Sequence, residues 1–284
     1  GESDETIKSA FKLFNERALP DLGNNIKCGN SLIGPDFYVG KQTSFLDTEE
    51  MQRVNAFDWE KEFPEIFKAG GFDAVIGNPP YVRQEMIGDF KEYFQRYYKV
   101  YDGVADIYVY FIERGIKFLS QNGFFSYIVA NKWMRANYGK NLRQWLKKQG
   151  LEEIVDFGDL PVFQKATTYP CIIRVTNNKP SNKVIIIPVK SLNFINLQEY
   201  VEKEKFILER NKLDDNGWSL SDERTQRLLD KIKKAGIPLG EYIKGEIYYG
   251  IKTGLNEAFV IDAETRKQLI AEDKKSADCF HFSR

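Results

Sequence analysis

A short apolar stretch that ends at two prolines constrains the fold of this chain more than any other feature. Residues 72–77, FDAVIG, have the length and apolar content of a buried strand, and Asn78, Pro79, Pro80 and Tyr81 follow it directly. Ligands of open α/β sheets bind at the carboxyl ends of the strands. These four residues are therefore expected at the edge of a sheet, where a ligand binds.

The four residues after this strand suit a site that binds an amino group. Pro79 and Pro80 lack an N–H group and have a fixed φ, so the turn is stiff and nearby carbonyl oxygens stay free for a ligand. Asn78 is held extended by the proline that follows it and adds a side-chain acceptor, while Tyr81 adds an aromatic face. Two acceptors that bind the hydrogens of an exocyclic amine favour a tetrahedral nitrogen, whose lone pair can attack a methyl sulfonium. The alternative interpretation is a plain proline turn after a strand.

Strands and helices are predicted to alternate along the chain. Apolar runs predict strands, and apolar residues at helical spacing predict helices, the third of which is expected to stop at Asn122-Gly123. The predicted strands are 72–77, 124–129, 154–157, 171–175 and 184–189, and the predicted helices are 4–17, part of 49–68, 105–120 and 138–149. Such alternation implies βαβ units, and hence an α/β fold with a mostly parallel sheet.

Changes in composition divide the chain into two domains and a linker. Residues 1–190 hold the elements above and are expected to form the larger domain, and the polar, irregular stretch 191–216 is expected to be a linker. Residues 217–284 are expected to form part of a smaller α+β domain, with a helix capped at Ser221 and a strand–turn–strand unit over 246–262.

The net charge is zero, but basic residues gather in two runs that contain no acid. Residues 131–151 contain six basic side chains and residues 160–198 contain five. A neutral chain can bind nucleic acid when its charge is segregated in this way. The candidate DNA contacts are Lys140, Arg143 and Lys147 in the first run, Lys165 in the second, and Lys252 further on. The alternative for each run is a solvated surface, and for Lys252 a hairpin that packs on its own domain.

Cysteine, histidine and apolar patterns exclude several classes of protein. The three cysteines are widely spaced and odd in number, which argues against a disulfide framework and for a reducing compartment such as the cytoplasm. His281 is the only histidine, so neither a histidine-rich metal site nor a Ser–His catalytic triad is expected. No apolar run approaches the roughly 20 residues that span a membrane, so no membrane partner is expected.

Residues 72–85 resemble the catalytic motif of the amino-methyltransferases of type IIG restriction–modification enzymes, which methylate the N6 amino group of adenine in DNA. Residues 78–81 are the specific part of this resemblance. Other segments resemble further motifs of that family, in the family's order and over nearly the whole chain. These segments are 27–32 for the motif near the cofactor adenine, 106–108 for the next cofactor-side motif, 123–131 for the strand after it, 162–167 for a loop whose aromatic residue stacks on a flipped adenine, and 245–262 for the start of a Taq I-like specificity domain.

The resemblance implies part of a Rossmann-like methyltransferase fold, followed by the start of a target-recognition domain, with S-adenosylmethionine as the cofactor. Phe163 matches the residue that stacks on the flipped base, so double-stranded DNA with a flipped adenine is the expected partner. Asn30 stands where the family often has an aspartate. The implied catalytic residues are Asn78, Pro79, Pro80 and Tyr81, and the implied cofactor-binding residues are Asn30, Ser31, Leu32 and Asn78.

Two elements of the family are not found in the chain. These are the glycine-rich loop for the methionine half of the cofactor and the acid for its ribose. The resemblance places both before residue 1, so N-terminal truncation is expected, and the missing N-terminal part of the same polypeptide is an expected partner. Any endonuclease of the parent protein is expected to lie outside the chain, and the chain by itself is expected to be a poor or inactive methyltransferase.

Other functions share parts of this pattern. The same four-residue motif serves methyltransferases that act on RNA bases or on protein glutamine, although the basic loop with Phe163 and the C-terminal domain favour DNA. A DNA-binding specificity fragment without activity of its own is a further alternative, favoured by the absent cofactor loop. Pro170-Cys171 resembles the nucleophile of cytosine-C5 methyltransferases, but because Cys171 opens an apolar strand, a buried thiol is expected.

Overall fold

The computed structural model describes residues 22–39, 48–82, 84–163, 168–245 and 261–274. The chain divides into two compact units, Gly1–Asp222 and Glu223–Arg284, which we call unit 1 and unit 2 and describe separately. The helix expected over 4–17 lies outside the described residues.

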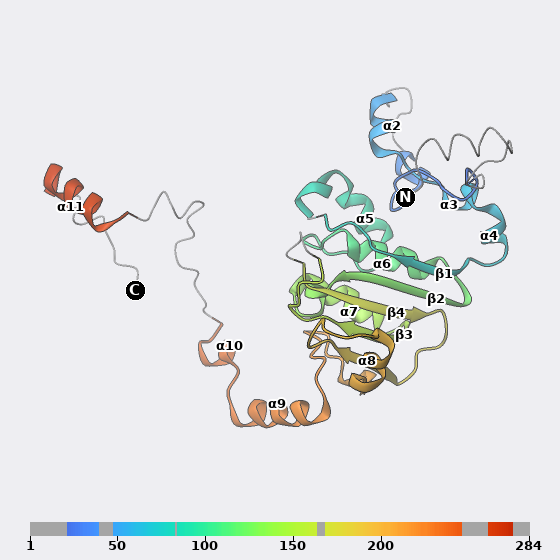
Figure 1. Ribbon diagram of the computed structural model, residues 1–284. Helices are drawn as coiled ribbons and strands as arrows, with labels where there is room; N and C mark the ends of the chain where they lie inside the picture. Colours follow the sequence, from blue (N-terminus) through green and yellow to red (C-terminus); the bar gives the residue numbers. More distant parts are fainter. Residues whose placement is uncertain (1–21, 40–47, 83, 164–167, 246–260, 275–284) are drawn as a thin grey trace, which may run out of the picture. The chain divides into compact units, whose positions relative to one another are not determined.

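Unit 1 is built on a six-stranded sheet with the strand order β1-β2-β4-β3-β5-β6 (Figure 1). The strands are β1 (Phe72–Gly77), β2 (Leu119–Ala130), β3 (Gly150–Asp156), β4 (Pro170–Thr176), β5 (Lys183–Pro188) and β6 (Phe206–Glu209). All five strands predicted from apolar runs are present. β1 lies at one edge of this sheet, where the Ile76 side chain is 86% exposed.

The α/β class is confirmed, but the described sheet is mixed rather than mostly parallel. β1 pairs with β2 and β3 pairs with β5 in parallel, whereas β2–β4, β3–β4 and β5–β6 are antiparallel. The chain turns back after β3 and inserts β4 between β2 and β3. A direct reversal of this kind can give only antiparallel neighbours, because parallel neighbours need a longer crossover.

Helices surround the sheet at the positions that helical spacing predicts, with several more besides. In unit 1 the helices and 3-10 turns are η1 (Pro35–Tyr38), α2 (Thr48–Val54), α3 (Trp59–Glu62), α4 (Pro64–Lys68), η3 (Gln84–Phe90), α5 (Lys91–Tyr97), α6 (Tyr108–Lys117), η4 (Asn131–Met134), η5 (Asn137–Gly139), α7 (Lys140–Leu146), α8 (Leu197–Glu204) and η6 (Arg210–Lys212). The predictions over 49–68, 105–120 and 138–149 are confirmed, while α5 and α8 were not predicted.

Side chains of the strands alternate between two apolar clusters, one on each face of the sheet. Ile154 and Ile173 belong to the main core, which includes residues of α6 and α7. Val155, which follows Ile154, and Ile172, which precedes Ile173, belong to a smaller cluster that includes Tyr200 of α8. This alternation is the period of a strand buried on both faces, which explains why these strands read as continuous apolar runs.

The sequence predicts that the Asn122-Gly123 pair ends a helix, and this prediction is wrong. α6 ends at Lys117, β2 already begins at Leu119, and the register of β1 against β2 shifts over this stretch. Asn122 has a φ of 65°, and a Cβ at Gly123 would lie 2.8 Å from the carbonyl oxygen of Phe72. The pair therefore forms an irregularity within β2, where the neighbouring backbone leaves no room for a side chain.

The stretch 191–216 is not a linker. α8 packs on the sheet through Tyr200 and Val201, and β6 pairs with β5. Leu213 and Trp218 are buried in the main core, and the boundary between the units falls at Asp222. A surface helix and an edge strand each expose a polar side to water, so their composition resembles that of a linker.

Unit 2 is helical within the residues that the structure describes. Its helices are α9 (Glu223–Ala235), α10 (Leu239–Tyr242) and α11 (Ala263–Glu272). α9 is the helix predicted after Ser221, and it ends directly before Gly236. The strands expected over 246–262 fall almost entirely outside the described residues. No described helix of either unit has the length and apolar character needed to cross a membrane.

Arg143 is a structural residue, and its assignment as a DNA contact is wrong. Its side chain is 1% exposed, and its guanidinium donates to the carbonyl oxygens of Trp133, Ala136 and Asp215. It thereby joins η4, η5 and the segment before Trp218. The planar guanidinium has several donors in fixed positions, which lets one side chain satisfy several buried carbonyls.

Replacing Arg143 with alanine is expected to destabilise unit 1 strongly. One buried and two partly buried carbonyl oxygens would lose a charged donor, and we expect the free energy of unfolding to fall by about 3 kcal/mol. Lys140→Ala, on the exposed side of the same helix, is the matched control and should change it by less than about 0.5 kcal/mol. Urea unfolding followed by tryptophan fluorescence measures both, and equal unfolding midpoints for the two variants would contradict this role.

Candidate active site

The carboxyl ends of β1, β2, β3 and β5 and the first residues of β4 and β6 lie on the same side of the sheet in unit 1, and the first four strands carry the candidate site. β1, β2 and β3 end there and β4 begins there, because β4 runs antiparallel to both of its neighbours. The paired residues nearest this side are Gly77 with Tyr127, Ala130 with Pro170, and Asp156 with Cys171. The motif 78–81, the segment 131–136 and the connection between β3 and β4 therefore leave the sheet on the same side.

The residues of the motif differ in their surroundings. Asn78 follows β1 directly and is exposed, and in the part of the chain that the structure describes no hydrogen bond holds its side chain. Pro79 is buried and Pro80 is exposed. Tyr81 is 37% exposed and its hydroxyl donates to the carbonyl oxygen of Ile128 at 3.4 Å, while burial raises the pKa of its phenol. The stiff turn thus presents a free amide beside an aromatic ring.

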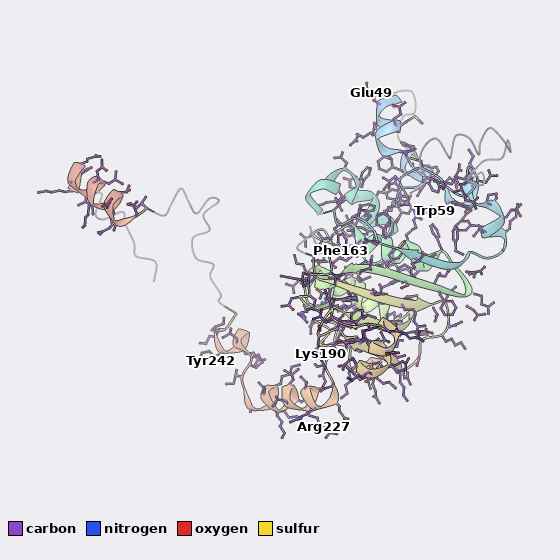
Figure 2. The ribbon with its side chains drawn as sticks, viewed as in Figure 1. Glu49, Trp59, Phe163, Lys190, Arg227 and Tyr242 are labelled. Carbon is purple, nitrogen blue, oxygen red and sulfur yellow. The ribbon has the colours of Figure 1, made fainter. Side chains whose placement is uncertain are left out.

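A cavity of about 780 Å³ opens beside Tyr81. The Tyr81 ring lies edge-on to Phe163, with 6.4 Å between the ring centroids, and 6.3 Å from the ring of Tyr108. The residues that line the cavity are Tyr81, Asp106, Tyr108, Ala130, Asn131, Lys132, Arg135, Ala136, Thr168 and Tyr169. The sequence predicts functional roles for Tyr81 and Phe163 from two separate motifs, and the structure brings these two rings together. Side chains of unit 1, including Phe163 and Trp59, are drawn in Figure 2.

Two tyrosines and an acid form a polar chain at the wall of this cavity. The hydroxyls of Tyr108 and Tyr138 lie 2.7 Å apart, and the Tyr138 hydroxyl donates to Oδ2 of Asp106 at 3.4 Å. Burial raises the pKa of both phenols, so both stay protonated near neutral pH. Sequence reasoning found Asp106 and Tyr108 through a motif but missed Tyr138, whose place beside them arises only from the fold.

The basic side chains at the cavity differ from the candidate DNA contacts that the sequence predicts. Lys132 and Arg135 line the cavity and are exposed, and Nζ of Lys132 lies 5.9 Å from the centre of the Tyr138 ring. Lys147 is paired with Asp215, with 2.8 Å between Nζ and Oδ1, and Lys140 is exposed but does not line the cavity. Lys165 and Lys252 lie outside the described residues.

Residues 30–32, which the sequence resemblance predicts to bind the cofactor, lie near a second, mostly apolar cavity of about 320 Å³. Ser31 lines this cavity, as do Trp59 and Phe111. The Oδ1 atom of Asn30 accepts a hydrogen bond from the Leu32 N–H at 3.2 Å, which shapes the turn between them. The Leu32 side chain is 1% exposed and belongs to the core, so its selection as a side chain that contacts a ligand is wrong.

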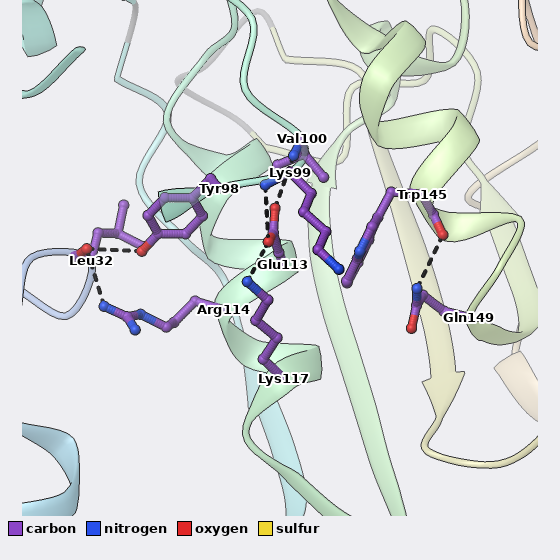
Figure 3. A network of polar contacts seen from close by, with 9 residues as sticks. All are labelled: Leu32, Tyr98, Lys99, Val100, Glu113, Arg114, Lys117, Trp145 and Gln149. Carbon is purple, nitrogen blue, oxygen red and sulfur yellow. Dashed lines mark hydrogen bonds and ion pairs between the residues drawn. The ribbon is translucent and has the colours of Figure 1, made fainter. Parts of the chain in front are cut away.

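Helix α6 holds this segment in place (Figure 3). The carbonyl oxygen of Leu32 accepts hydrogen bonds from the Tyr98 hydroxyl at 2.8 Å and from Nη2 of Arg114 at 3.2 Å. Glu113, fully buried beside Arg114 in sequence, accepts from the backbone N–H groups of Lys99 and Val100 and pairs with Lys117. The Nε atom of Arg114 is buried without a hydrogen-bond partner, and Arg114 also lines the second cavity.

Cys171 is a buried thiol, as expected from its place in an apolar strand. Its side chain is 0% exposed, and burial raises the pKa of the thiol well above its usual value. A protonated thiol inside the core cannot attack a base. Among the described residues no group of histidine, cysteine, aspartate and glutamate side chains could hold a metal ion.

Comparisons with known proteins match the chain to methylases of restriction–modification systems. The family model described as Eco57I restriction-modification methylase matches residues 6–163. The type II restriction enzyme and methyltransferase RM.Eco57I of Escherichia coli is 26% identical over 274 residues, which cover 92% of this chain and 24% of that protein. The type II methyltransferase M.BstVI of Geobacillus stearothermophilus is 28% identical over 228 residues, which cover 72% of this chain and 40% of that protein. The chain thus spans less than half the length of either relative.

Two solved structures are similar to parts of this chain. The methyltransferase subunit of a type I restriction-modification system from Streptococcus thermophilus covers 59% of this chain and 40% of its own, with 17% identity and a TM-score of 0.45. The type IIG restriction endonuclease BpuSI covers 59% of this chain and 23% of its own, with 15% identity and a TM-score of 0.43. The family model matches more than half of the chain, and the chain therefore belongs to the Eco57I restriction-modification methylase family.

Proposed function

We propose that this chain contributes the catalytic turn and the base-binding cavity to a protein that methylates the N6 amino group of adenine in double-stranded DNA, with S-adenosylmethionine as the methyl donor. One observation carries the proposal. The exposed side chain of Asn78 directly follows β1 and stands three residues before Tyr81, which lines the cavity and has its ring 6.4 Å from that of Phe163. Relatives that are named type II methyltransferases support it.

The chemistry assigned to the motif follows from its free acceptors. The Asn78 side-chain oxygen and the Pro79 carbonyl oxygen accept the two hydrogens of the target amine. This withdraws the nitrogen lone pair from the ring and directs it at the methyl group. Because both acceptors lie on a stiff turn, they need little reorganisation during the reaction.

The large cavity supports the extraction of a base from the duplex. An enzyme that reacts with a base must first rotate it out of the stack, and the exposed base then needs an aromatic face. The cavity has room for an adenine, Tyr81 supplies an aromatic face in its wall, and Phe163 contacts the Tyr81 ring. Lys132 and Arg135 are placed to contact the phosphates on either side of the extracted nucleotide.

The second cavity suits the adenine ring of the cofactor. Its walls include the apolar residues Trp59, Ile76 and Phe111, and the buried Nε of Arg114 is a donor that lacks a partner. Asn30 and Ser31 would then be the polar residues at this ring. When bound, the cofactor supplies a methyl group on a positively charged sulfur.

Asn78→Ala is expected to lower the rate of methyl transfer by roughly 100-fold or more, because a preorganised acceptor at the reacting nitrogen would be lost. DNA binding should stay within about twofold, since the Asn78 side chain is small and holds no other residue. Transfer of tritiated methyl groups to duplex DNA measures the rate, with RNA and a glutamine peptide as competing acceptors. Asn182→Ala is the control, because this exposed asparagine lies in the link between β4 and β5, at the opposite ends of the strands from Asn78. Equal rates for the two variants would remove Asn78 from the mechanism.

Phe163→Ala is expected to reduce the fluorescence gain of 2-aminopurine placed at the target adenine. Stacking of a base on an aromatic side chain contributes about 1–3 kcal/mol, so the extracted state should become at least fivefold less populated. Phe124→Ala replaces a phenylalanine of β2 that is 52% exposed and far along the strand from the cavity, and should leave the gain unchanged. A full gain with Phe163→Ala would contradict the stacking role.

The double variant Lys132→Ala/Arg135→Ala is expected to flatten the salt dependence of DNA binding. Each lost phosphate contact lowers the slope of log K against log salt by about 0.9, so a change near 2 is expected. Lys140→Ala/Lys148→Ala removes two exposed lysines that do not line the cavity and serves as the control. If the control pair changes the slope more than the cavity pair, the DNA-facing surface lies on α7 instead.

A further inference from the structure

One residue, Asn131, holds both ends of the connection that carries Phe163. The Nδ2 atom of its side chain donates to Oδ1 of Asp156 at 2.9 Å and to the carbonyl oxygen of Gly158 at 3.0 Å. Its backbone N–H donates to the carbonyl oxygen of Tyr169 at 2.7 Å. Asp156 and Gly158 stand where the connection leaves β3, and Tyr169 stands where it enters β4.

The start of the connection is fixed by one shared acceptor. Oδ1 of Asp156 accepts the side-chain amide of Asn131 and also the backbone N–H of Gly158, at 3.0 Å. Gly158 has a φ of 57°, a left-handed conformation that glycine adopts without strain. Both partners of the Asn131 amide are acceptors, so its nitrogen must face them. The turn out of β3 is therefore defined by hydrogen bonds rather than by packing alone.

Asn131 joins this turn to the cavity. It is the first residue after β2, and it lines the 780 Å³ cavity together with Tyr169. Beyond Gly158, Leu160 and Val162 pack on the smaller apolar cluster, and Phe163 comes next, edge-on to Tyr81. The path from Asn131 to Phe163 is thus a short segment that is fixed at its start by hydrogen bonds and near its end by apolar contacts.

We propose that Asn131 is a positioning residue, which acts through Asp156 and Gly158 to place Phe163 against Tyr81 in the cavity wall. The inference rests on the proposed function, because it takes Phe163 as the residue that stacks on the extracted base. Without the Asn131 amide, the Asp156 carboxylate loses a donor and the connection can leave β3 along other paths. A displacement of about 1 Å at a reacting or stacking group can lower a rate about 100-fold.

A charge exchange between two residues tests the inference. Asn131→Asp places a second carboxylate against Asp156, and the repulsion should displace the connection. We expect the 2-aminopurine gain to fall at least fivefold and methyl transfer to fall about 100-fold. Asp156→Asn keeps an acceptor oxygen for both of its donors, so both readouts should stay within about twofold. In the double variant the two carboxylates no longer repel each other, so part of the loss should be recovered, although the amide at position 156 cannot both accept from the Gly158 N–H and donate to position 131 through the same atom.

The same set of variants tests whether Asn131 acts through Phe163. Adding Phe163→Ala to Asn131→Asp should lower the 2-aminopurine gain little further, because residues that act through one another are not additive. Thermal unfolding and the affinity for S-adenosylmethionine should stay near the values of the unchanged protein in every variant, which separates positioning from a general loss of structure.

Three results would overturn the inference. They are an unchanged gain in Asn131→Asp, the lack of recovery in the double variant, and a full additional loss from Phe163→Ala. If the unchanged protein methylates DNA while any of these holds, the proposed function stands and the role of Asn131 does not. If the unchanged protein gives neither methyl transfer nor a 2-aminopurine gain, the proposed function fails and this inference fails with it.

Discussion

The pairing of β2 with its two neighbours determines where every element of the candidate site lies. β2 runs parallel to β1 and antiparallel to β4, and its register places Gly77 beside Tyr127 and Ala130 beside Pro170. Because side chains alternate along a strand, a shift by one residue would exchange the two faces of β2 and remove Phe125 from the core. The cavity wall, the motif after β1 and the connection before β4 all depend on this register.

Charged side chains that are buried or half-buried in unit 1 hydrogen-bond to the backbone. Glu113 accepts the N–H groups of Lys99 and Val100, Arg143 donates to three carbonyl oxygens, and Arg210 donates to those of Lys147, Gln149 and Leu151. A buried backbone group without a partner is costly, and one ionised side chain can satisfy several of them. This explains why the basic run 131–151 is divided: Arg143 faces inward, whereas Lys132 and Arg135 line the cavity.

The sequence predicts the strands and the place of the motif well, because short apolar runs and proline act locally. The α/β class follows from the alternation of predicted strands and helices, and the position of Asn78 after a strand follows from residues 72–81 alone. The features that the sequence fails to predict depend on contacts between residues that are far apart in the sequence. The burial of Arg143 depends on Asp215, the order β2-β4-β3 depends on how the chain returns, and Tyr138 reaches Asp106 only through the fold. The edge strand β6 was mistaken for linker because half of its surface faces water.

The topology also orders the assembly of the site in time. The connection between β3 and β4 is the shortest link between consecutive strands that pair with each other, so its closure is expected to lose the least chain entropy. The contacts of β1 and β4 with β2 join segments much further apart in sequence, and contacts of that kind form late in folding. Asn131 follows β2 and binds both ends of the β3–β4 connection, so its hydrogen bonds complete only when β2 docks. A folding intermediate that contains the β3–β4 hairpin but lacks β2 would therefore hold Phe163 on its loop with no cavity beside it.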